Sequence, residues 1–353
     1  MAESRSRTAE RSQLGYLAGG LLTAALLIGC SGSGEGDALL TSYQRDLAHA
    51  LGQPAPEPGD PVNIGALPDR RERLFVIPDT RAALLDVYAL RECHITSLVA
   101  ARNNQLGRVA PPSQRWIYEL ELWRRLHACW HSEVPEALSD SNRERLARLT
   151  MTKTKQLPMV SWNTLFDSDE WTGSFSRASS PLEPDSRDAI DEQLAAIEWL
   201  HAATLNQFSL EWQHASSTLE GHLDTLRRRP LTAEVLRALL LAEQRLGEAN
   251  ALLEASLADT ASCRPLAEAA DELKTLFRQV PAIEWLDELE AQASRWLGAV
   301  DTLLESHASP PEAVARYRHR WLSLDNPEAP LPAFLATRDA HQRHWQALAE
   351  RCE

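Results

Sequence analysis

Apolar side chains recur every three or four positions through most of the chain after residue 38, and no segment shows sustained period-two alternation with β-branched residues. A spacing of three and four places one apolar stripe on an α-helix, whereas a half-buried strand requires a spacing of two. The chain also has only 15 glycines in 353 residues, which leaves few positions for tight hairpin turns. The sequence therefore predicts an all-α protein: an elongated antiparallel helical bundle with long, coiled-coil-like helices, some of them tied by disulfides.

Prolines and losses of periodicity divide this pattern into separate helices. The predicted helices cover residues 38–51, 80–106, 113–130, 139–166, 190–226, 235–257, 266–280, 282–304 and a last segment that carries Phe334 to Cys352. The pattern over 190–226 fits one helix of about 40 residues, or two helices with a break near Thr204. Pro158 interrupts the weaker pattern of residues 139–166.

Two segments lack helical periodicity and bear on the domain organisation. Residues 53–79 contain six prolines and fit either an ordered loop wrapped on the body or a disordered linker. Periodicity is lost again around Pro181 and Pro184. We therefore expect an N-terminal helical sub-domain of residues 38–180 and a C-terminal helical bundle of residues 181–353 packed on it.

The N-terminal segment has the features of an export signal. Three arginines precede an apolar run of about 15 residues, which is too short to span a membrane permanently. The run closes with Leu27-Ile28-Gly29-Cys30, which resembles a bacterial lipobox. We expect residues 1–29 to be removed, Cys30 to carry the lipid, and residues 30–37 to form a flexible tether. The alternative is an ordinary signal peptide with an incidental cysteine.

The residues after the signal segment indicate where the protein is held. No second run of 18 apolar residues follows, so the acyl chains on Cys30 are the expected attachment to the lipid bilayer. Ser31 follows the cysteine, as in lipoproteins sorted to the outer membrane, whereas retained lipoproteins carry Asp there. The predicted location is the bacterial cell envelope, on the outer membrane and facing the periplasm.

The net charge argues against nucleic acid as a partner. The whole chain carries −14, and removal of the signal segment makes it one unit more negative, since that segment holds three arginines against two glutamates. Nucleic-acid binding draws most of its affinity from neutralised phosphates, which an acidic surface repels.

The cysteines form an even set once Cys30 is acylated. Cys93, Cys129, Cys263 and Cys352 remain, and an oxidising periplasm allows three pairings among them. We favour Cys93 with Cys129, because both lie at similar distances from the turn at residues 111–112. We favour Cys263 with Cys352, because the last helix would direct Cys352 inward.

The sequence lacks phosphate-binding glycine loops, metalloprotease helices, paired-cysteine metal motifs and nucleophile elbows. The one cluster with metal-ligand chemistry is His127, Cys129 and His131, which could hold zinc on one helix face. A disulfide explains the cysteines without a metal, so we expect no metal, no cofactor and no catalytic residue.

Three tryptophans follow one another on one helix face. Trp116, Trp123 and Trp130 are seven residues apart and could form a platform for carbohydrate or lipid. Their helical spacing favours packing in the core instead.

The turn after residue 106 is the predicted partner-binding surface. Gly107, Pro111 and Pro112 force a turn there, and a rigid hairpin presents polar side chains at low ordering cost. The candidate contacts are Arg102, Asn103, Asn104, Gln105 and Arg115. In the alternative interpretation Asn103 or Asn104 satisfies the last helix carbonyls, and Arg102 pairs with Glu119 inside the fold.

Several of these motifs also resemble a known family. They are Cys93, the run Arg102 to Val109, Pro112 to Arg115, Tyr118-Glu119, Cys129, the ending Ala340 to Trp345 and Cys352. Together they resemble a family of proteobacterial envelope lipoproteins known only as a domain of unknown function. The resemblance implies an envelope lipoprotein, and it implies no activity, cofactor or catalytic residue.

Two functional hypotheses follow. The first is a non-enzymatic lipoprotein that binds or scaffolds an envelope protein or a cell-wall component. The second is an enzyme, metal-dependent or other, that acts on envelope components through the region of His127 to His131. The missing nucleophile, base and metal motifs favour the first.

Replacing the acyl acceptor tests the predicted anchor. We expect Cys30→Ser to prevent lipidation and to leave the uncleaved precursor, because the thiol accepts the diacylglycerol before cleavage. Labelled fatty acid and the electrophoretic mobility of the product are the measurements. Label on the Cys30→Ser protein would contradict the assignment of the lipobox.

Overall fold

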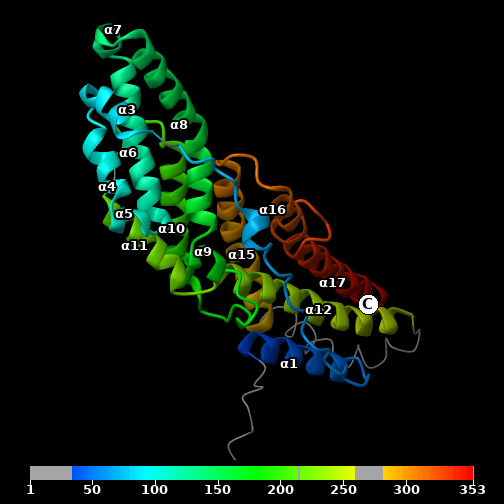
Figure 1. Ribbon diagram of the computed structural model, residues 1–353. Coiled ribbons are helices and arrows are strands. Elements are labelled where there is room, and N and C mark those ends of the chain that lie inside the picture. Colours follow the sequence, from blue (N-terminus) through cyan, green and yellow to red (C-terminus); the bar gives the residue numbers. More distant parts are fainter. Residues whose placement is uncertain (1–33, 81, 214, 259–280, 353) are drawn as a thin grey trace, which may run out of the picture. The chain divides into compact units, whose positions relative to one another are not determined.

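Every regular element that the structure describes is a helix, as the sequence predicts (Figure 1). The structure is a computed structural model that describes residues 34–80, 82–213, 215–258 and 281–352. Cys30, Cys263 and the predicted helix over 266–280 lie outside the described residues, so the lipidation and the pairing of Cys263 with Cys352 stay predictions. Residues Glu35–Glu353 form one compact unit. The division at residue 181 stays a prediction as well.

The elements follow one another with short connections. They are α1 (Glu35–Ala50), α2 (Arg70–Arg73), α3 (Leu84–Ala89), the 3₁₀ helix η1 (Arg91–Cys93), α4 (Thr96–Asn103), α5 (Gln105–Arg108), α6 (Pro112–Trp130), α7 (Val134–Ala137), α8 (Asp140–Phe166), α9 (Asp169–Gly173), α10 (Arg187–Leu205), α11 (Ser216–Arg227), α12 (Leu231–Ala258), α15 (Pro281–Glu305), α16 (Glu312–Tyr317), the π-helix η2 (Arg318–Leu322) and α17 (Pro330–Cys352). None of those described is long and apolar enough for a membrane span.

The neighbouring helices α6 and α8 pack antiparallel, whereas α12 and α17, which are far apart in the sequence, pack parallel. Thr164 near the end of α8 bonds to Pro112 at the start of α6, which fixes these two helices as an antiparallel pair. By contrast, Asn250 of α12 lies beside His341 of α17, and Leu257 beside Arg351, so these two helices run in the same direction. Figure 1 shows α12 and α17 side by side.

Two hydrophobic clusters hold the described helices together. The larger cluster is built around α12, where sixteen of the 28 residues are buried, and includes α1, α10, α15 and α17. The second cluster is small and lies between α3, η1, α6 and α8. Its buried residues are Val87, Leu90, Cys93, Ile95, Leu122, Leu126, Cys129 and Leu146.

The disulfide between Cys93 and Cys129 is present, as predicted. It joins the end of η1 to the last turn of α6, and both residues are buried in the second cluster. A bridge that closes a loop of 36 positions stabilises by roughly 3 to 4 kcal/mol on the chain-entropy account.

The single helix predicted over residues 80–106 is wrong. The chain forms α3, η1, α4 and α5 there, because His94 adopts a left-handed conformation (φ 56°) and Asn104 starts a new helical turn. Gly107, which we expected in the turn, lies within α5 and does not adopt the left-handed conformation. A Cβ on it would come within 2.3 Å of the Ala101 carbonyl oxygen, so glycine is required by close backbone approach.

Three other features of the helices differ from the prediction or settle an alternative that the sequence left open. The chain over 190–226 is not one long helix, since α10 ends at Leu205 and α11 begins at Ser216. Pro158 lies inside a continuous α8, where the flanking Leu157 and Trp162 are buried. Helix α1 begins at Glu35, so the last three residues predicted for the tether are helical.

The proline-rich residues 53–79 form the ordered loop of the two alternatives. The Phe75 backbone exchanges two hydrogen bonds of 2.9 and 2.8 Å with the side-chain amide of Asn163, which holds the loop against α8. Trp162 also donates to the Arg73 carbonyl oxygen at 2.8 Å. The loop therefore crosses α8 on its way to α3.

The tryptophan stripe is mostly core. Trp116 and Trp123 are buried, as the helical spacing favours, whereas Trp130 is 36% exposed at the end of α6.

A closed hydrogen-bond network links α1, α12 and α17. Asn250 donates to the Thr337 carbonyl, so its oxygen faces His341 Nδ1 at 2.7 Å, and Nδ1 must carry the proton. His341 Nε2 then accepts from the Tyr43 hydroxyl at 2.7 Å, and Trp345 donates to that hydroxyl. The network requires neutral His341.

We expect acid to destabilise the protein through two buried histidines. Burial lowers the pKa of His341 and of His307 from 6.5 to about 4. The unfolded chain binds more protons than the native one between these values, so stability is full above pH 6.5 and falls as the pH drops toward 4. The loss is at most about 3 kcal/mol for each histidine. Urea unfolding at several pH values measures it.

A His341→Gln variant separates this effect from the titration of carboxylates. Glutamine cannot take up the proton, so the variant should lose stability less steeply than the native chain between pH 6.5 and 4. If the free energy of unfolding falls equally steeply with pH in the two proteins, His341 does not contribute to the acid destabilisation.

Candidate functional site

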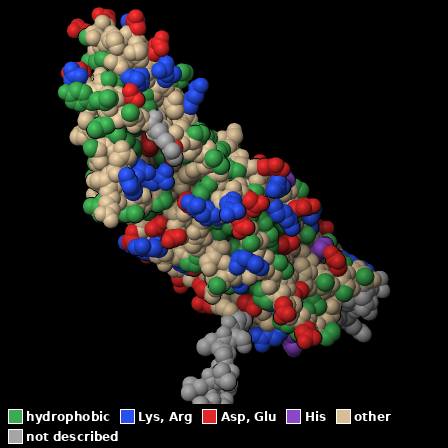
Figure 2. All heavy atoms as spheres, in the orientation of Figure 1, with side chains coloured by type: hydrophobic (Ala, Val, Ile, Leu, Met, Phe, Trp, Pro, Cys, Tyr) green, Lys and Arg blue, Asp and Glu red, His purple; other side chains and the backbone are tan. Residues whose placement is uncertain are grey.

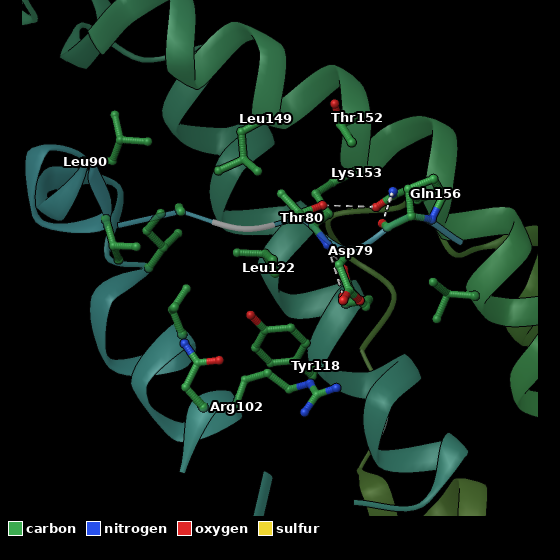
Figure 3. A pocket seen from close by; sticks show the side chains of 18 of the residues that line it. Asp79, Thr80, Leu90, Arg102, Tyr118, Leu122, Leu149, Thr152, Lys153 and Gln156 are labelled. Atoms are coloured by element: carbon green, nitrogen blue, oxygen red, sulfur yellow. Dashed lines mark hydrogen bonds and ion pairs between the residues drawn. The ribbon is translucent and has the colours of Figure 1, made fainter. Parts of the chain in front are cut away.

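A cleft of about 530 Å³ lies between α6, α8 and the segment from Ile77 to Asn103 (Figure 3). We call it the α6–α8 cleft. Its lining residues are Ile77, Pro78, Asp79, Thr80, Ala82, Asp86, Val87, Leu90, Ile95, Val99, Arg102, Asn103, Arg115, Tyr118, Glu119, Leu122, Arg145, Arg148, Leu149, Thr152, Lys153, Gln156 and Val160. Its volume is that of a site for a small ligand.

Helical spacing places the lining residues of α6 and α8 on facing sides. Arg115, Tyr118, Glu119 and Leu122 are three or four apart, and so share one face of α6. The α8 residues Leu149, Thr152, Lys153 and Gln156 are spaced in the same way. Two helices in an antiparallel pair that turn such faces to one side form the two sides of a groove.

The segment before α4 closes the groove from two directions. Gln156 donates to the Pro78 carbonyl at 3.0 Å, and the Thr80 hydroxyl lies 3.4 Å from the Gln156 side-chain oxygen, so residues 78–80 cross α8 (Figure 3). Further along, the disulfide and the hydrogen bond from Arg125 to the His94 carbonyl hold η1 and α4 against α6. The wall opposite α8 is therefore fixed by covalent and polar contacts.

A buried ion pair lies in the floor of the cleft. Lys153 Nζ is 2.9 Å from a carboxylate oxygen of Glu119, and the two side chains are 9% and 18% exposed. In such surroundings each charge depends on the other, since an unpaired buried charge is costly. The pair therefore links α6 to α8 at the centre of the cleft.

Tyr118 points into the cleft beside this pair (Figure 3). Burial, together with the negative charge of Glu119, raises the pKa of Tyr118 to about 12. The phenol is therefore protonated at neutral pH and can donate a hydrogen bond. Its hydroxyl has no hydrogen-bond partner within the described part of the chain, so it is available to a ligand.

Cationic side chains outnumber carboxylates around the α6–α8 cleft. The described lining includes five cations against three carboxylates, in a chain whose net charge is −14. Figure 2 shows basic and acidic side chains interspersed over the face that it draws. The cleft thus has a charge opposite to that of the whole protein.

These cations differ in whether a carboxylate neutralises them. Arg145 pairs with Asp86 at 2.8 Å, and Arg148 pairs with Glu144 at 3.3 Å. Arg102 instead donates to the Gly107 carbonyl and lies 6.0 Å from the Tyr118 ring centre, and forms no ion pair with any described residue. The Arg115 side chain is exposed and has no polar partner among the residues described. Two uncompensated charges therefore lie at one end of the cleft.

The predicted partner-binding residues divide into two groups. Arg102, Asn103 and Arg115 line the cleft, whereas Asn104 and Gln105 do not. Asn104 caps α5, since its side-chain oxygen accepts from the Gly107 N–H at 2.8 Å. Arg102 does not pair with Glu119, whose partner is Lys153.

Sequence reasoning missed the cleft residues that come from α8. Lys153 lies on the buried stripe Leu146, Thr150, Lys153 and Leu157, with a spacing of four, three and four. A lysine on an otherwise uncharged buried stripe signals a buried partner. That signal was present in the sequence, but the identity of the partner depended on the register of α6 and α8.

The region of His127 and His131 has no third metal ligand among the described residues. The two rings are 4.2 Å apart, and Cys129 between them is in the disulfide. Burial, followed by the charge of His131, lowers the pKa of His127. No group of three or more His, Cys, Asp or Glu side chains in the described ranges could hold a metal ion.

The chain belongs to the family described as "Protein of unknown function (DUF3080)", whose model matches residues 40–353. No curated protein and no solved structure matches the sequence.

Removing one partner of the buried ion pair should weaken the fold. We expect Lys153→Met to destabilise the chain by about 2 kcal/mol, because Glu119 then keeps a partly buried charge without a partner. The double variant with Glu119→Gln should recover part of that loss. Denaturant unfolding of Lys153→Met, Glu119→Gln, the double variant and the native chain measures the coupling, and additive losses would show that the two side chains act independently.

Proposed function

We propose that this chain is a bacterial envelope lipoprotein that binds a ligand or partner in the α6–α8 cleft and performs no catalysis. Acyl chains on Cys30 hold it on the outer membrane, facing the periplasm. Nucleic acid is not a partner, and no metal or cofactor is required. The observation that carries the proposal is the pair of uncompensated arginines, Arg102 and Arg115, at a cleft of about 530 Å³.

The chemistry of the lining residues favours binding over catalysis. Tyr118, Arg102, Arg115 and Asn103 can donate hydrogen bonds and attract negative charge. The part of the lining that the structure describes includes no serine, cysteine or histidine. The alternative, an enzyme acting on envelope components, would have to use carboxylates of the lining, of which Asp86 and Glu119 already pair with Arg145 and Lys153.

The lipobox and the position of α1 support attachment close to a membrane. Helix α1 begins at Glu35, five residues after Cys30. A fully extended chain of four residues spans about 14 Å, so the anchor would keep the body near the bilayer surface. A protein held in this way meets ligands of the membrane and of the adjoining periplasm.

Exposed apolar side chains on α3 and near α5, outside the cleft lining, support a macromolecular partner. Leu84 and Leu85 on α3 are 79% and 80% exposed, and Leu106 and Val109 near α5 are 79% and 77% exposed. Exposed apolar groups on one segment are typical of contact surfaces. An envelope protein or a cell-wall component could cover them.

Photocrosslinking in intact cells tests the proposal. We expect a photoreactive residue at position 115 to form adducts with an envelope component when Cys30 is present, and to lose them in Cys30→Ser. The control position is 227, an exposed arginine on α11, away from the cleft.

Two results would contradict the proposal. One is a protein that is not acylated and does not fractionate with the outer membrane. The other is a position 115 that gives no more adducts than position 227. In either case the cleft would not be the contact site of an anchored binding protein.

A further inference from the structure

We propose that the ligand of the α6–α8 cleft is a single-chain lipid with an anionic head, whose head lies at Arg102 and Arg115 and whose acyl chain lies along the second hydrophobic cluster. This inference rests on the function proposed above and specifies its ligand.

The cleft has a cationic end and an apolar end because α4 and α6 run antiparallel in a fixed register. Cys93 forms the disulfide with Cys129, the His94 carbonyl accepts from Arg125, and Arg102 lies over the Tyr118 ring. Residue numbers therefore rise along the segment from Cys93 to Arg102 while they fall along α6. Arg102 therefore lies opposite Tyr118, one helical turn from Arg115, and Val99 and Ile95 lie farther along toward Leu122.

The same polarity is visible in the close view of the cleft. Figure 3 shows Arg102 and Tyr118 together on one side, Leu122 next to Tyr118, and Leu90 and Leu149 farther away. The apolar end is completed by Val87, Ile95 and Val99. A ligand that fills the cleft must therefore have a charged end and an apolar end.

The cationic end suits a carboxylate or a phosphate. Arg115 has no polar partner among the described residues, and Arg102 has no carboxylate partner within that set. The Tyr118 hydroxyl adds a donor without a negative charge. Charge-assisted hydrogen bonds from arginines to such anions are roughly twice as strong as neutral ones.

The opposite end is polar at its rim, but its charges are already paired. Arg145 is bonded to Asp86, and Arg148 to Glu144, so neither requires a second anion. The head of a ligand is therefore directed to Arg102 and Arg115 and its chain to the other end.

An acyl chain fits the apolar end better than a peptide does. The walls here are the helices α3, α4, α6 and α8, whose interior backbone groups are bonded within each helix. A peptide would leave its own amides without partners against Val87, Val99 and Leu122, at a cost that an acyl chain avoids.

Displacement of a fluorescent fatty acid tests the inference. Residues 35–353 form one compact unit, so the chain can be secreted behind an ordinary signal peptide without residues 1–30. The probe is cis-parinaric acid, whose fluorescence rises on entry into an apolar site. The competitors are palmitate, lysophosphatidic acid, palmityl alcohol and inorganic phosphate.

We expect palmitate and lysophosphatidic acid to displace the probe, and inorganic phosphate to fail because it lacks the chain. Arg115→Gln should weaken palmitate about tenfold, while palmityl alcohol changes little. The matched control is Arg108→Gln, which removes the same charge from α5 at a residue outside the lining. Arg102→Gln is expected to weaken palmitate as well, but it also removes the hydrogen bond to Gly107. Arg115 has no described polar partner, so Arg115→Gln should fold even where Arg102→Gln does not.

Three results would overturn the inference. They are no binding of the probe, full displacement by inorganic phosphate alone, and equal effects of Arg115→Gln and Arg108→Gln. If position 115 still crosslinks to an envelope protein or cell-wall component in cells, the proposed function stands and only the ligand class is wrong. If the lipid binds in solution but the protein is not anchored in the envelope, the ligand class stands and the proposed function as an anchored envelope protein is wrong.

Discussion

The buried guanidinium of Arg245 fixes the N-terminal part of the body. Its side chain is 2% exposed, and it binds Asp37 at 2.7 Å, Glu248 at 3.0 Å and the Gly59 carbonyl at 3.0 Å. A buried charge that loses one partner costs several kcal/mol, so α1 and the loop after it must stay against α12. The N-terminal helix is therefore part of the core, held on α12 by the partners of this guanidinium.

The sequence predicted what depends on local spacing and missed what depends on register. Periodicity identified most helices, and the even cysteine count with a short connection identified the Cys93–Cys129 bridge. The apolar spacing continues through residues 84–106 although the chain turns at His94, so no pattern could reveal the break. Parallel packing of α12 on α17 is equally invisible, because no short connection joins these helices.

The difference between local spacing and helix register also explains which residues of the candidate site could be predicted from the sequence. Turn chemistry near Gly107 pointed to Arg102, Asn103 and Arg115, which line the cleft. It also pointed to Asn104, whose side chain only caps α5. Tyr118 and Lys153 become site residues through the pairing of α6 with α8, which the spacing of either helix alone does not determine. Local patterns thus located one end of the cleft, and tertiary packing supplies the rest.

The two hydrophobic clusters differ in a way that fits binding at the smaller one. In the larger cluster the buried polar groups at His341 form a closed network between α1, α12 and α17. The smaller cluster borders an open cleft, and side chains beside empty space lose contacts that a filled core would have. The Cys93–Cys129 bridge and the Lys153–Glu119 pair hold its walls in place of close packing. The cross-links therefore keep open a cleft that borders an apolar cluster, which is the geometry that the lipid ligand proposed above requires.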